Sequence, residues 1–286
     1  MDIAYIIASF TRQIRFPGRY YLLRHLFPPE RFRRDHTGDR WLTNYDGDLK
    51  ILCGLGSFIE WNIFFRGYHD QGFSSALKRL VKKGMIILDV GANVGGYTIL
   101  MAKYTGENGK VIAFEPNPEV YDRLRQNVLA NDFQNRVVLH PIALSKTSGW
   151  STLYIPKESC SNRGISSLYK YADMLADKLE VAVSTVDDEA KRGSFQRVDL
   201  IKIDTEGNDG LVIEGAKDVI NRDRPIIIFE ADHQAHQKAG LILKSTSDRL
   251  RELGYNFSTI DTFGRLRKSG AGKPLPDTNI VCLPGY

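Results

Sequence analysis

From residue 85 onward the sequence repeats one pattern, in which a short, mainly apolar run is followed by a polar turn and a segment with helical spacing. Residues 85–90 (MIILDV), 110–115 (KVIAFE) and 200–203 (LIKI) are three of these runs. Apolar runs without polar alternation are typical of strands that are buried on both faces, as in parallel sheets. Because these strands alternate with helices, the sequence predicts a doubly wound, mostly parallel α/β sheet.

The same pattern continues beyond these three runs. Further strands are predicted at 137–142 and 225–229, and residues 255–260 and 279–283 can close the sheet as an antiparallel pair, which makes seven strands. Ligands of such sheets bind outside the carboxyl ends of the strands, so functional residues are expected there. The connection over 145–198 is too long for a plain loop and indicates a functional insertion. Helices are predicted over 209–221 and about 238–253.

The net charge of +5 is concentrated near the N-terminus. Residues 1–40 hold eight arginines and four acidic residues, so the rest of the chain is nearly neutral. Aromatic residues are interleaved with these arginines as far as Pro28-Pro29, which must break any helix. Two interpretations stay open: a helical cap that packs on the body, or a contact surface for anionic lipid, glycan or nucleic acid.

A β-hairpin is predicted between this arm and the sheet. Residues 41–66 alternate apolar and polar residues around Asp46-Gly47, which is a strong turn signal, and a segment with helical spacing follows at 73–82. We therefore divide the chain into a basic, aromatic arm (1–40), a hairpin and helix leading into the core (41–84), and a body (85–286).

Composition excludes several classes of protein. Hydrophobic residues make up 42% and charged residues 26% of the chain, which excludes a disordered or collagen-like chain. No apolar run approaches the length of a transmembrane helix, and the first residues do not resemble a secretory signal. Cys53, Cys160 and Cys282 lie far apart and predict neither a disulfide framework nor a zinc site, which fits a reducing cytoplasm.

A glycine-rich loop follows the first strand of the body, with the sequence DVGANVGGYT from Asp89 to Thr98. Its glycines allow a sharp turn and a close approach to a ligand. A dinucleotide-binding loop carries a glycine where this chain has Asn93, whose side chain crowds a pyrophosphate; a nicotinamide-dependent dehydrogenase is therefore disfavoured. Asp89 would also repel a phosphate, and it favours a ligand that is positively charged near this loop.

S-adenosylmethionine fits this loop, because it carries an ammonium group and a sulfonium but no phosphate. Glu115 ends the second strand, where a carboxylate can accept hydrogen bonds from both ribose hydroxyls. The alternative is that Asp89 caps a helix and the glycines only form a turn. The predicted cofactor-binding residues are Asp89, Gly91, Ala92, Asn93, Val94, Gly95, Thr98, Glu115, Pro116, Asn117 and Ala143.

Four motifs together resemble the FkbM family of S-adenosylmethionine-dependent methyltransferases. They are DVGANVGGYT at 89–98, FEP at 114–116, IKIDTEG at 201–207 and FE at 229–230. The GYHD sequence that ends at Asp70 is similar to the G-x-Y-E element of that family, with aspartate in place of glutamate. The resemblance covers about residues 45–283. It implies a class I, Rossmann-like methyltransferase domain over 85–286 that methylates hydroxyls of sugars, glycolipids or secondary metabolites.

Acidic residues follow the fourth and fifth strands, where the acceptor is expected. A sugar hydroxyl is a poor nucleophile until a positioned base removes its proton. We predict Asp204 as the base or the group that orients the acceptor, with His233 as the second choice and Glu230 beside them. An aspartate needs burial or a carboxylate neighbour to act as a base near pH 7, and Glu206 can be that neighbour. The alternative is that Asp204 and Glu206 cap the next helix and that His233 is an exposed loop residue.

Two further assignments stay open around this site. Asp204, Glu206, Glu230 and His233 could form an oxygen-rich divalent metal site, although their spacing does not require one. The polar loop of the insertion could close over the acceptor or be an ordinary surface loop; its candidate substrate-binding residues are Asn162, Arg163 and Ser166. The histidines interpreted as surface or packing residues are His25, His36, His69, His140 and His236.

The sequence thus predicts a cytoplasmic S-adenosylmethionine-dependent O-methyltransferase, and contact of its arm with the inner face of an anionic membrane is one of the two interpretations that stay open for the arm. RNA methylation is an alternative, but the turn from Asp204 to Gly207 lacks the aromatic residue on which a base stacks, and its carboxylates would repel phosphates. A methyltransferase-like scaffold that binds a partner through the arm, without catalysis, is a second alternative.

Overall fold

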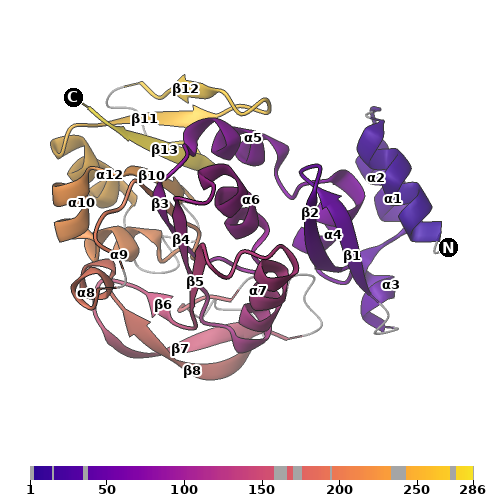
Figure 1. Cartoon of the computed structure of the whole chain (residues 1–286), viewed down its shortest axis with the longest axis horizontal. Helices are drawn as coiled ribbons and strands as arrows, with labels where there is room; N and C mark the ends of the chain where they lie inside the picture. The colour runs from indigo at the N-terminus through magenta and orange to yellow at the C-terminus, as the bar shows by residue number, and fades with distance from the viewer. Residues whose placement is uncertain are drawn as a thin grey trace.

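The computed structural model describes residues 3–14, 16–34, 38–157, 166–169, 176–193, 195–232, 243–270 and 275–285. Within these residues one large sheet has eight strands in the order β12-β11-β13-β10-β9-β3-β4-β5 (Figure 1). The strands from β10 to β5 in this order are parallel to one another, whereas β13, β11 and β12 pair antiparallel. The strands are β3 (Ile86–Val90), β4 (Lys110–Phe114), β5 (Val137–His140), β9 (Leu200–Ile203), β10 (Ile226–Glu230), β11 (Tyr255–Ile260), β12 (Leu266–Lys268) and β13 (Asn279–Pro284).

The predicted doubly wound α/β fold is confirmed. The sheet has one strand more than predicted, because the short, charged segment β12 pairs with β11 at the edge. Helices cover both faces: α5 (Gln71–Leu80), α6 (Gly96–Thr105) and α7 (Pro118–Ala130) on one, and α8 (Val186–Lys191), α9 (Asp209–Glu214), α10 (Lys217–Asp223) and α12 (Leu243–Glu252) on the other. The two cores follow from strand alternation, since Ile87 belongs to one core and Leu88 to the other.

Two predicted elements differ from the structure. The single helix expected over 209–221 is divided into α9 and α10 near Gly215, where the backbone of Ser145 approaches so closely that a Cβ would lie 2.2 Å from its oxygen. The hairpin predicted over 41–66 is right for β1 (Asp39–Tyr45) and β2 (Leu49–Gly54), but its second half is the helix α4 (Phe58–Arg66). Six consecutive residues of α4 are buried, so its sequence has no polar face and hides the helical period.

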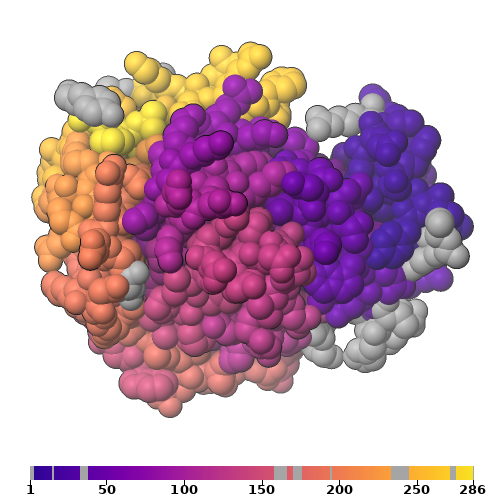
Figure 2. All heavy atoms as spheres, in the orientation of Figure 1, coloured from indigo at the N-terminus to yellow at the C-terminus, as the bar shows by residue number. Residues whose placement is uncertain are grey.

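The N-terminal arm consists of α1 (Ile3–Gln13), α2 (Arg19–Leu26) and α3 (Pro29–Arg34), which form one end of the molecule (Figures 1 and 2). The break predicted at Pro28-Pro29 lies between α2 and α3. The arm packs on α4: the Thr11 hydroxyl donates to the Phe65 carbonyl oxygen at 3.0 Å, and Trp61 Nε1 donates to the Phe27 carbonyl oxygen at 2.7 Å.

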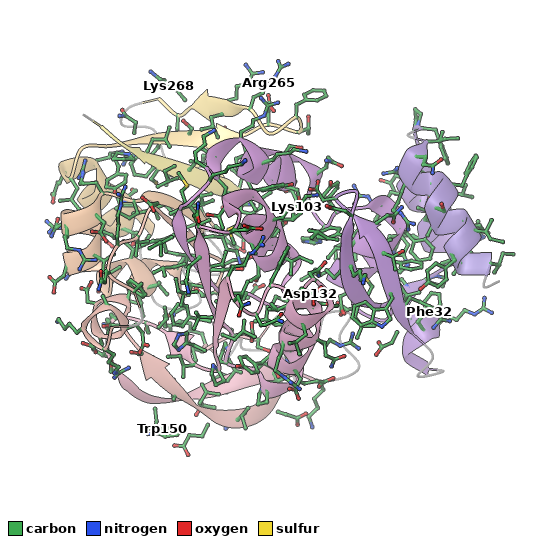
Figure 3. All side chains as sticks on the ribbon, in the orientation of Figure 1. Phe32, Lys103, Asp132, Trp150, Arg265 and Lys268 are labelled. Atoms are coloured by element: carbon green, nitrogen blue, oxygen red, sulfur yellow. The ribbon has the colours of Figure 1, made fainter. Side chains whose placement is uncertain are left out.

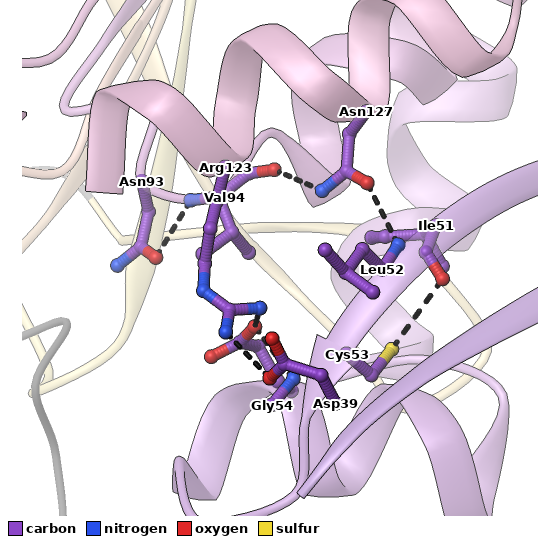
Figure 4. Close-up of polar contacts among 10 residues, drawn as sticks. Asp39, Ile51, Leu52, Cys53, Gly54, Asn93, Val94, Arg123 and Asn127 are labelled. Carbon is purple, nitrogen blue, oxygen red and sulfur yellow. Dashed lines mark hydrogen bonds and ion pairs between the residues drawn. The ribbon is translucent and has the colours of Figure 1, made fainter. Parts of the chain in front are cut away.

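Polar contacts join the hairpin to the helices of the sheet. Lys103 of α6 reaches the hairpin turn, where its Nζ lies 2.9 Å from Asp46 Oδ2 (Figure 3). Asn127 of α7 accepts from the Leu52 amide and donates to the Val94 carbonyl oxygen, both at 2.7 Å (Figure 4). Asn127 therefore connects the hairpin directly to the glycine-rich loop.

The predicted insertion forms a small sheet of its own, with the order β6-β8-β7. Its strands are β6 (Ala143–Leu144), β7 (Gly149–Pro156) and β8 (Ala176–Ser184), and they enclose a core of Ala143, Leu153, Val181 and Val183. Trp150 points away from this sheet into solvent (Figure 3). The insertion thus adds a wall to the molecule without extending the large sheet.

Candidate active site

Two connected hollows lie at the carboxyl ends of β3, β4, β9 and β10. The first, which we name the strand-end cleft, has a cavity volume of about 70 Å³. The second, the α4 cavity, has a cavity volume of about 340 Å³ and extends beneath α4. The two hollows share Ile59, Gly91, Asn93, Asp204 and Glu206. The other residues of the strand-end cleft are Val90, Phe114, Glu115, Pro116, Ile142, Ala143, Leu144, Leu153, Ser166, Leu168, Thr205 and Asn208.

The glycine-rich loop adopts a backbone that its sequence requires. Gly91 has φ of 72°, and a Cβ at this position would lie 1.9 Å from the Asp204 carbonyl oxygen, so only glycine fits. Asn93 has φ of 51°, and its own side chain accepts from the Val94 amide at 2.7 Å (Figure 4). Asparagine tolerates this left-handed conformation better than most residues. The loop therefore brings backbone atoms of two strand ends together at the cleft.

Glu115 lies where the sequence predicts, at the end of β4 and in the wall of the cleft. Its two carboxylate oxygens accept from the Asn93 and Asn117 amides, both at 2.9 Å. Burial raises its pKa to about 7, against the lowering effect of these two hydrogen bonds. A carboxylate offers about four acceptor positions, so about two are left for hydroxyl groups of a ligand.

Asp89 differs from its predicted place. Its side chain is fully buried and lines neither hollow. Its carboxylate accepts from the Thr98 hydroxyl at 2.6 Å and lies 3.1 Å from Lys202 Nζ. Asp89 was expected to meet a positively charged ligand, but the positive charge beside it is Lys202 of the protein itself. Thr98, also fully buried, holds Asp89 rather than facing the cleft.

Lys202 is a residue that the sequence interpretation missed. It belongs to β9, is almost completely buried, and donates to the Gly91 carbonyl oxygen at 2.8 Å. Its Nζ also lies 3.6 Å from Asp204 Oδ2. Burial alone would lower the pKa of Lys202, but the carboxylates of Asp89 and Asp204 outweigh burial and raise it. The signal in the sequence was a lysine inside the apolar run LIKI.

The predicted carboxylates gather at the junction of the two hollows. Asp204 and Glu206 line both hollows, and Glu230 lines the α4 cavity. Burial, followed by repulsion from Asp204 and Glu230, raises the pKa of Glu206 to about 8. Burial, followed by repulsion from Asp204, raises the pKa of Glu230 to about 7. Near neutral pH this cluster therefore holds protons that it can exchange.

His69 also belongs to the site, although the sequence interpretation treated it as a surface or packing residue. It lines the α4 cavity, with its ring edge-on to Phe58 at 6.1 Å. Burial lowers its pKa, whereas the charges of Asp204 and Asp70 act in the opposite direction. Its Nδ1 is buried and has no hydrogen-bond partner among the described residues. Asp70 accepts from the Phe73 amide at 2.9 Å as the N-cap of α5, which fixes the segment that carries His69.

The remaining predicted residues are distributed around the cleft. Pro116 and Ala143 line it, while Asn117 is buried, caps α7 and donates to the Ser166 hydroxyl at 3.0 Å. Ala92 and Val94 are buried and line the α4 cavity. Gly95 has φ of 87° and precedes α6. His233, Asn162 and Arg163 lie outside the described residues. Within the described ranges, no three His, Cys, Asp or Glu side chains are grouped in a way that could hold a metal ion.

Comparison with known proteins identifies the family. Residues 89–257, more than half of the chain, match the Methyltransferase FkbM domain. The chain belongs to the FkbM family of methyltransferases. It is a family of S-adenosylmethionine-dependent methyltransferases, so the predicted family is confirmed.

Relatives of the FkbM protein described here include two curated methyltransferases. Methyltransferase sdnD of Sordaria araneosa is 30% identical over 154 residues, which are 45% of this chain and 59% of that protein. Hexuronic acid methyltransferase AglP of Haloferax volcanii is 23% identical over 145 residues, 50% of this chain and 54% of that protein. The chain thus spans about half the length of these relatives. The crystal structure of an FkbM methyltransferase from Methylobacillus flagellatus superposes with a TM-score of 0.46 at 14% identity, covering 93% of this chain and 60% of that one.

Proposed function

We propose that this FkbM protein is an O-methyltransferase that transfers the methyl group of S-adenosylmethionine to a hydroxyl of a sugar, a glycolipid or a secondary metabolite. The observation that carries the proposal is the junction of two hollows at Asp204 and Glu206. One hollow contains the ribose-type carboxylate Glu115, and the other is a separate cavity with room for an acceptor. Methyl transfer needs two such sites that meet, because acceptor oxygen and donor must be aligned at close range.

The strand-end cleft suits S-adenosylmethionine in its residues. Glu115 keeps acceptor positions for two ribose hydroxyls, and the apolar residues Ile142, Ala143 and Leu168 suit an adenine ring. Asn93 adopts a left-handed backbone in the loop and stands where a pyrophosphate site would have its middle glycine. When bound, the cofactor would supply an electrophilic methyl group on a sulfonium. Leu168 of the insertion lines the cleft together with Ala143, which precedes the insertion.

The acceptor would occupy the α4 cavity, with its hydroxyl at Asp204. Asp204 remains the first candidate for the base, and His69 replaces His233 as the second among the described residues. Burial lowers the pKa of His69, which keeps its imidazole neutral and able to accept a proton near neutral pH. Glu206 and Glu230, with their raised pKa values, would relay or share that proton rather than add two full negative charges.

The charges around the α4 cavity favour an uncharged acceptor. Asp70, Asp204, Glu206 and Glu230 line it, against the single buried cation Lys202 in its wall. A carboxylate or phosphate beside the reacting hydroxyl would be repelled there. Phe58, Phe73 and Tyr97 add aromatic surface, which suits the apolar face of a sugar ring or a polyketide. We infer a neutral, hydroxylated acceptor.

We further propose that the chain is organised as an arm (1–40), a hairpin and helix (41–84) and a methyltransferase domain (85–286). Helix α4, within 41–84, would then form the roof of the acceptor cavity through Phe58, Ile59 and Ile63. The second unit would therefore belong to the site and not only to the scaffold.

The proposal is tested by a methyl-transfer screen with labelled cofactor over neutral sugars, lipid-linked sugars, hydroxylated metabolites and uronic acids, with EDTA and with added magnesium. We expect transfer to a neutral hydroxyl that EDTA leaves unchanged. Asp204→Asn should bind cofactor normally and lose turnover by about 100-fold or more, the usual contribution of a general base. Asp122→Asn, an exposed carboxylate on α7, is the matched control.

A parallel titration tests the cofactor assignment. Glu115→Gln should weaken S-adenosylmethionine binding by about 10- to 150-fold, since a hydrogen bond to a charged group contributes about 1.5–3 kcal/mol. Glu107→Gln, on the exposed turn before β4, should not change it. Binding by Glu115→Gln within about twofold of the unchanged protein would contradict the ribose role. Methylation of nitrogen, or of uronic acids alone, would contradict the acceptor class.

A further inference from the structure

Helix α1 buries its small residues and exposes several of its large apolar ones. Ala4, Ala8 and Thr11 are at most 4% exposed, and they form one stripe at helical spacing. On the opposite side Ile3, Ile6 and Phe10 are 64%, 52% and 56% exposed, and Ile14, just beyond the helix, is 45% exposed. A surface helix that packs only against the core of its own protein has its large apolar residues on the inward face. The outward face of α1 is therefore an apolar surface without a partner in this chain's described residues.

This orientation is held in place and is not the result of loose packing. The small face of α1 approaches α4 closely enough for the Thr11 hydroxyl to donate to the Phe65 carbonyl oxygen at 3.0 Å. Arg12 donates to the neighbouring Phe64 carbonyl oxygen at 2.5 Å, and the Tyr5 ring meets Phe64 edge-on at 5.2 Å. Turning the helix to bury Ile6 and Phe10 would break these contacts. These contacts hold the large apolar side chains outward on a helix that lies at one end of the molecule (Figure 1).

The segment that carries this face is strongly basic. Residues 3–34 hold seven arginines and one acidic residue, Glu30, so this segment carries a surplus of six positive charges. Helix α2 adds exposed apolar side chains, of which Tyr21 is 78% exposed. Exposed apolar side chains and a basic segment are the two features by which amphipathic helices bind anionic bilayer surfaces. None of the described helices is long and apolar enough to cross a membrane, so the contact would lie in the interface plane.

We propose that α1, assisted by α2, docks this methyltransferase on an anionic membrane surface through Ile3, Ile6 and Phe10. A second copy of the chain is a poorer occupant, because a symmetric contact would bring two surpluses of six positive charges together. A nucleic acid would use the arginines but would leave the apolar face in water. Only a surface that is both anionic and apolar satisfies both features.

Docking here would also place the acceptor site, given the proposed function. Helix α4 contacts α1 through Phe64 and Phe65 on one side and lines the acceptor cavity through Phe58 and Ile59 on the other. One rigid helix thus separates the membrane-facing arm from the cavity. An acceptor that is itself anchored in the membrane would meet the cavity near the bilayer surface.

The proposal is tested by sedimenting the full chain with vesicles of phosphatidylcholine, with and without phosphatidylglycerol. We expect binding to the anionic vesicles that weakens as salt is raised. The double variant Ile6→Asp/Phe10→Asp should lower the partition coefficient by about tenfold or more, because it removes apolar insertion and adds negative charge. Trp150→Asp, which alters an even more exposed aromatic residue on β7, should bind as the unchanged protein does. The sedimentation assay needs no methyl acceptor, so its result does not depend on whether the proposed methyl-transfer function is right.

Three results would overturn the proposal. The first is equal sedimentation of the unchanged protein and the double variant. The second is binding that does not depend on phosphatidylglycerol. The third is a salt-stable dimer in solution that Ile6→Asp/Phe10→Asp converts to monomer while vesicle binding is absent, since this would assign the face to a second copy. The melting temperature of the double variant checks its fold, which we expect to be intact because both side chains point into solvent.

Discussion

Replacing Lys202 with methionine removes the only cation that the structure places in contact with buried Asp89 within the described residues. Methionine keeps most of the lysine side chain's length and apolar volume, so packing within β9 should change little. Asp89 would keep its hydrogen bond from Thr98 but lose the charge 3.1 Å away. Removing one partner of a buried ion pair costs about 3–5 kcal/mol, because the other charge stays buried without compensation.

The structure also sets an upper limit on this loss. Instead of remaining charged, the buried carboxyl can take up a proton during folding. An aspartic acid has a reference pKa of about 3.9, and each pH unit above it costs about 1.36 kcal/mol, so the limit is about 4 kcal/mol at pH 7 and about 1.5 kcal/mol at pH 5. The variant's folded state binds more protons than its unfolded state, so its deficit must shrink as the pH falls.

Urea unfolding followed by tryptophan fluorescence at pH 5 and pH 7 measures this loss. We expect Lys202→Met to lose about 3–4 kcal/mol at pH 7 and about 1.5 kcal/mol at pH 5, relative to the unchanged protein at the same pH. Lys202→Met/Asp89→Asn should recover much of the loss, because the buried charge is gone. Lys110→Met, at an exposed position on β4, should stay within about 0.5 kcal/mol. A loss below about 1 kcal/mol at pH 7, or one of equal size at both pH values, would refute the reasoning.

Two further predictions concern the cleft. Since the folded pKa of Glu206 is raised to about 8, its contribution to stability is present below its unfolded pKa of about 4.3 and is lost as the pH rises through 8. Glu206→Gln should therefore flatten the fall in unfolding free energy between about pH 5 and pH 9. An identical slope in both proteins would count against a buried carboxyl that its neighbours repel. Gly91→Ala should abolish cofactor binding in a titration, because its Cβ would lie 1.9 Å from the Asp204 carbonyl oxygen. The control is Gly47→Ala, at a position with a similar positive φ but open space around it, which should lose stability only and bind cofactor normally. Normal binding by Gly91→Ala would show that the loop relaxes around the new side chain.

The sequence by itself determined the features that depend on neighbouring residues. Buried parallel strands lack polar alternation, so β3, β4 and β9 could be predicted from short windows. The turn at Asp46-Gly47 is equally local, because a few residues fix its backbone angles. Since parallel strands end at one edge of a sheet, the positions of Glu115 and Asp204 beside the cleft followed from these strands.

Only the tertiary structure decided the contacts between distant segments. The partner of Asp89 is Lys202, which lies more than a hundred residues away and is revealed by the pairing of β3 with β9. His69 became part of the α4 cavity because α4 and α5 fold over the ends of the strands. The contact with α4 likewise determines which face of α1 points outward. The sequence of α1 does not say which face is buried, and the close approach to α4 buries the face with the small residues. The periodicity of a sequence indicates that an element has two different faces. Which element packs against each face depends on the topology of the whole fold.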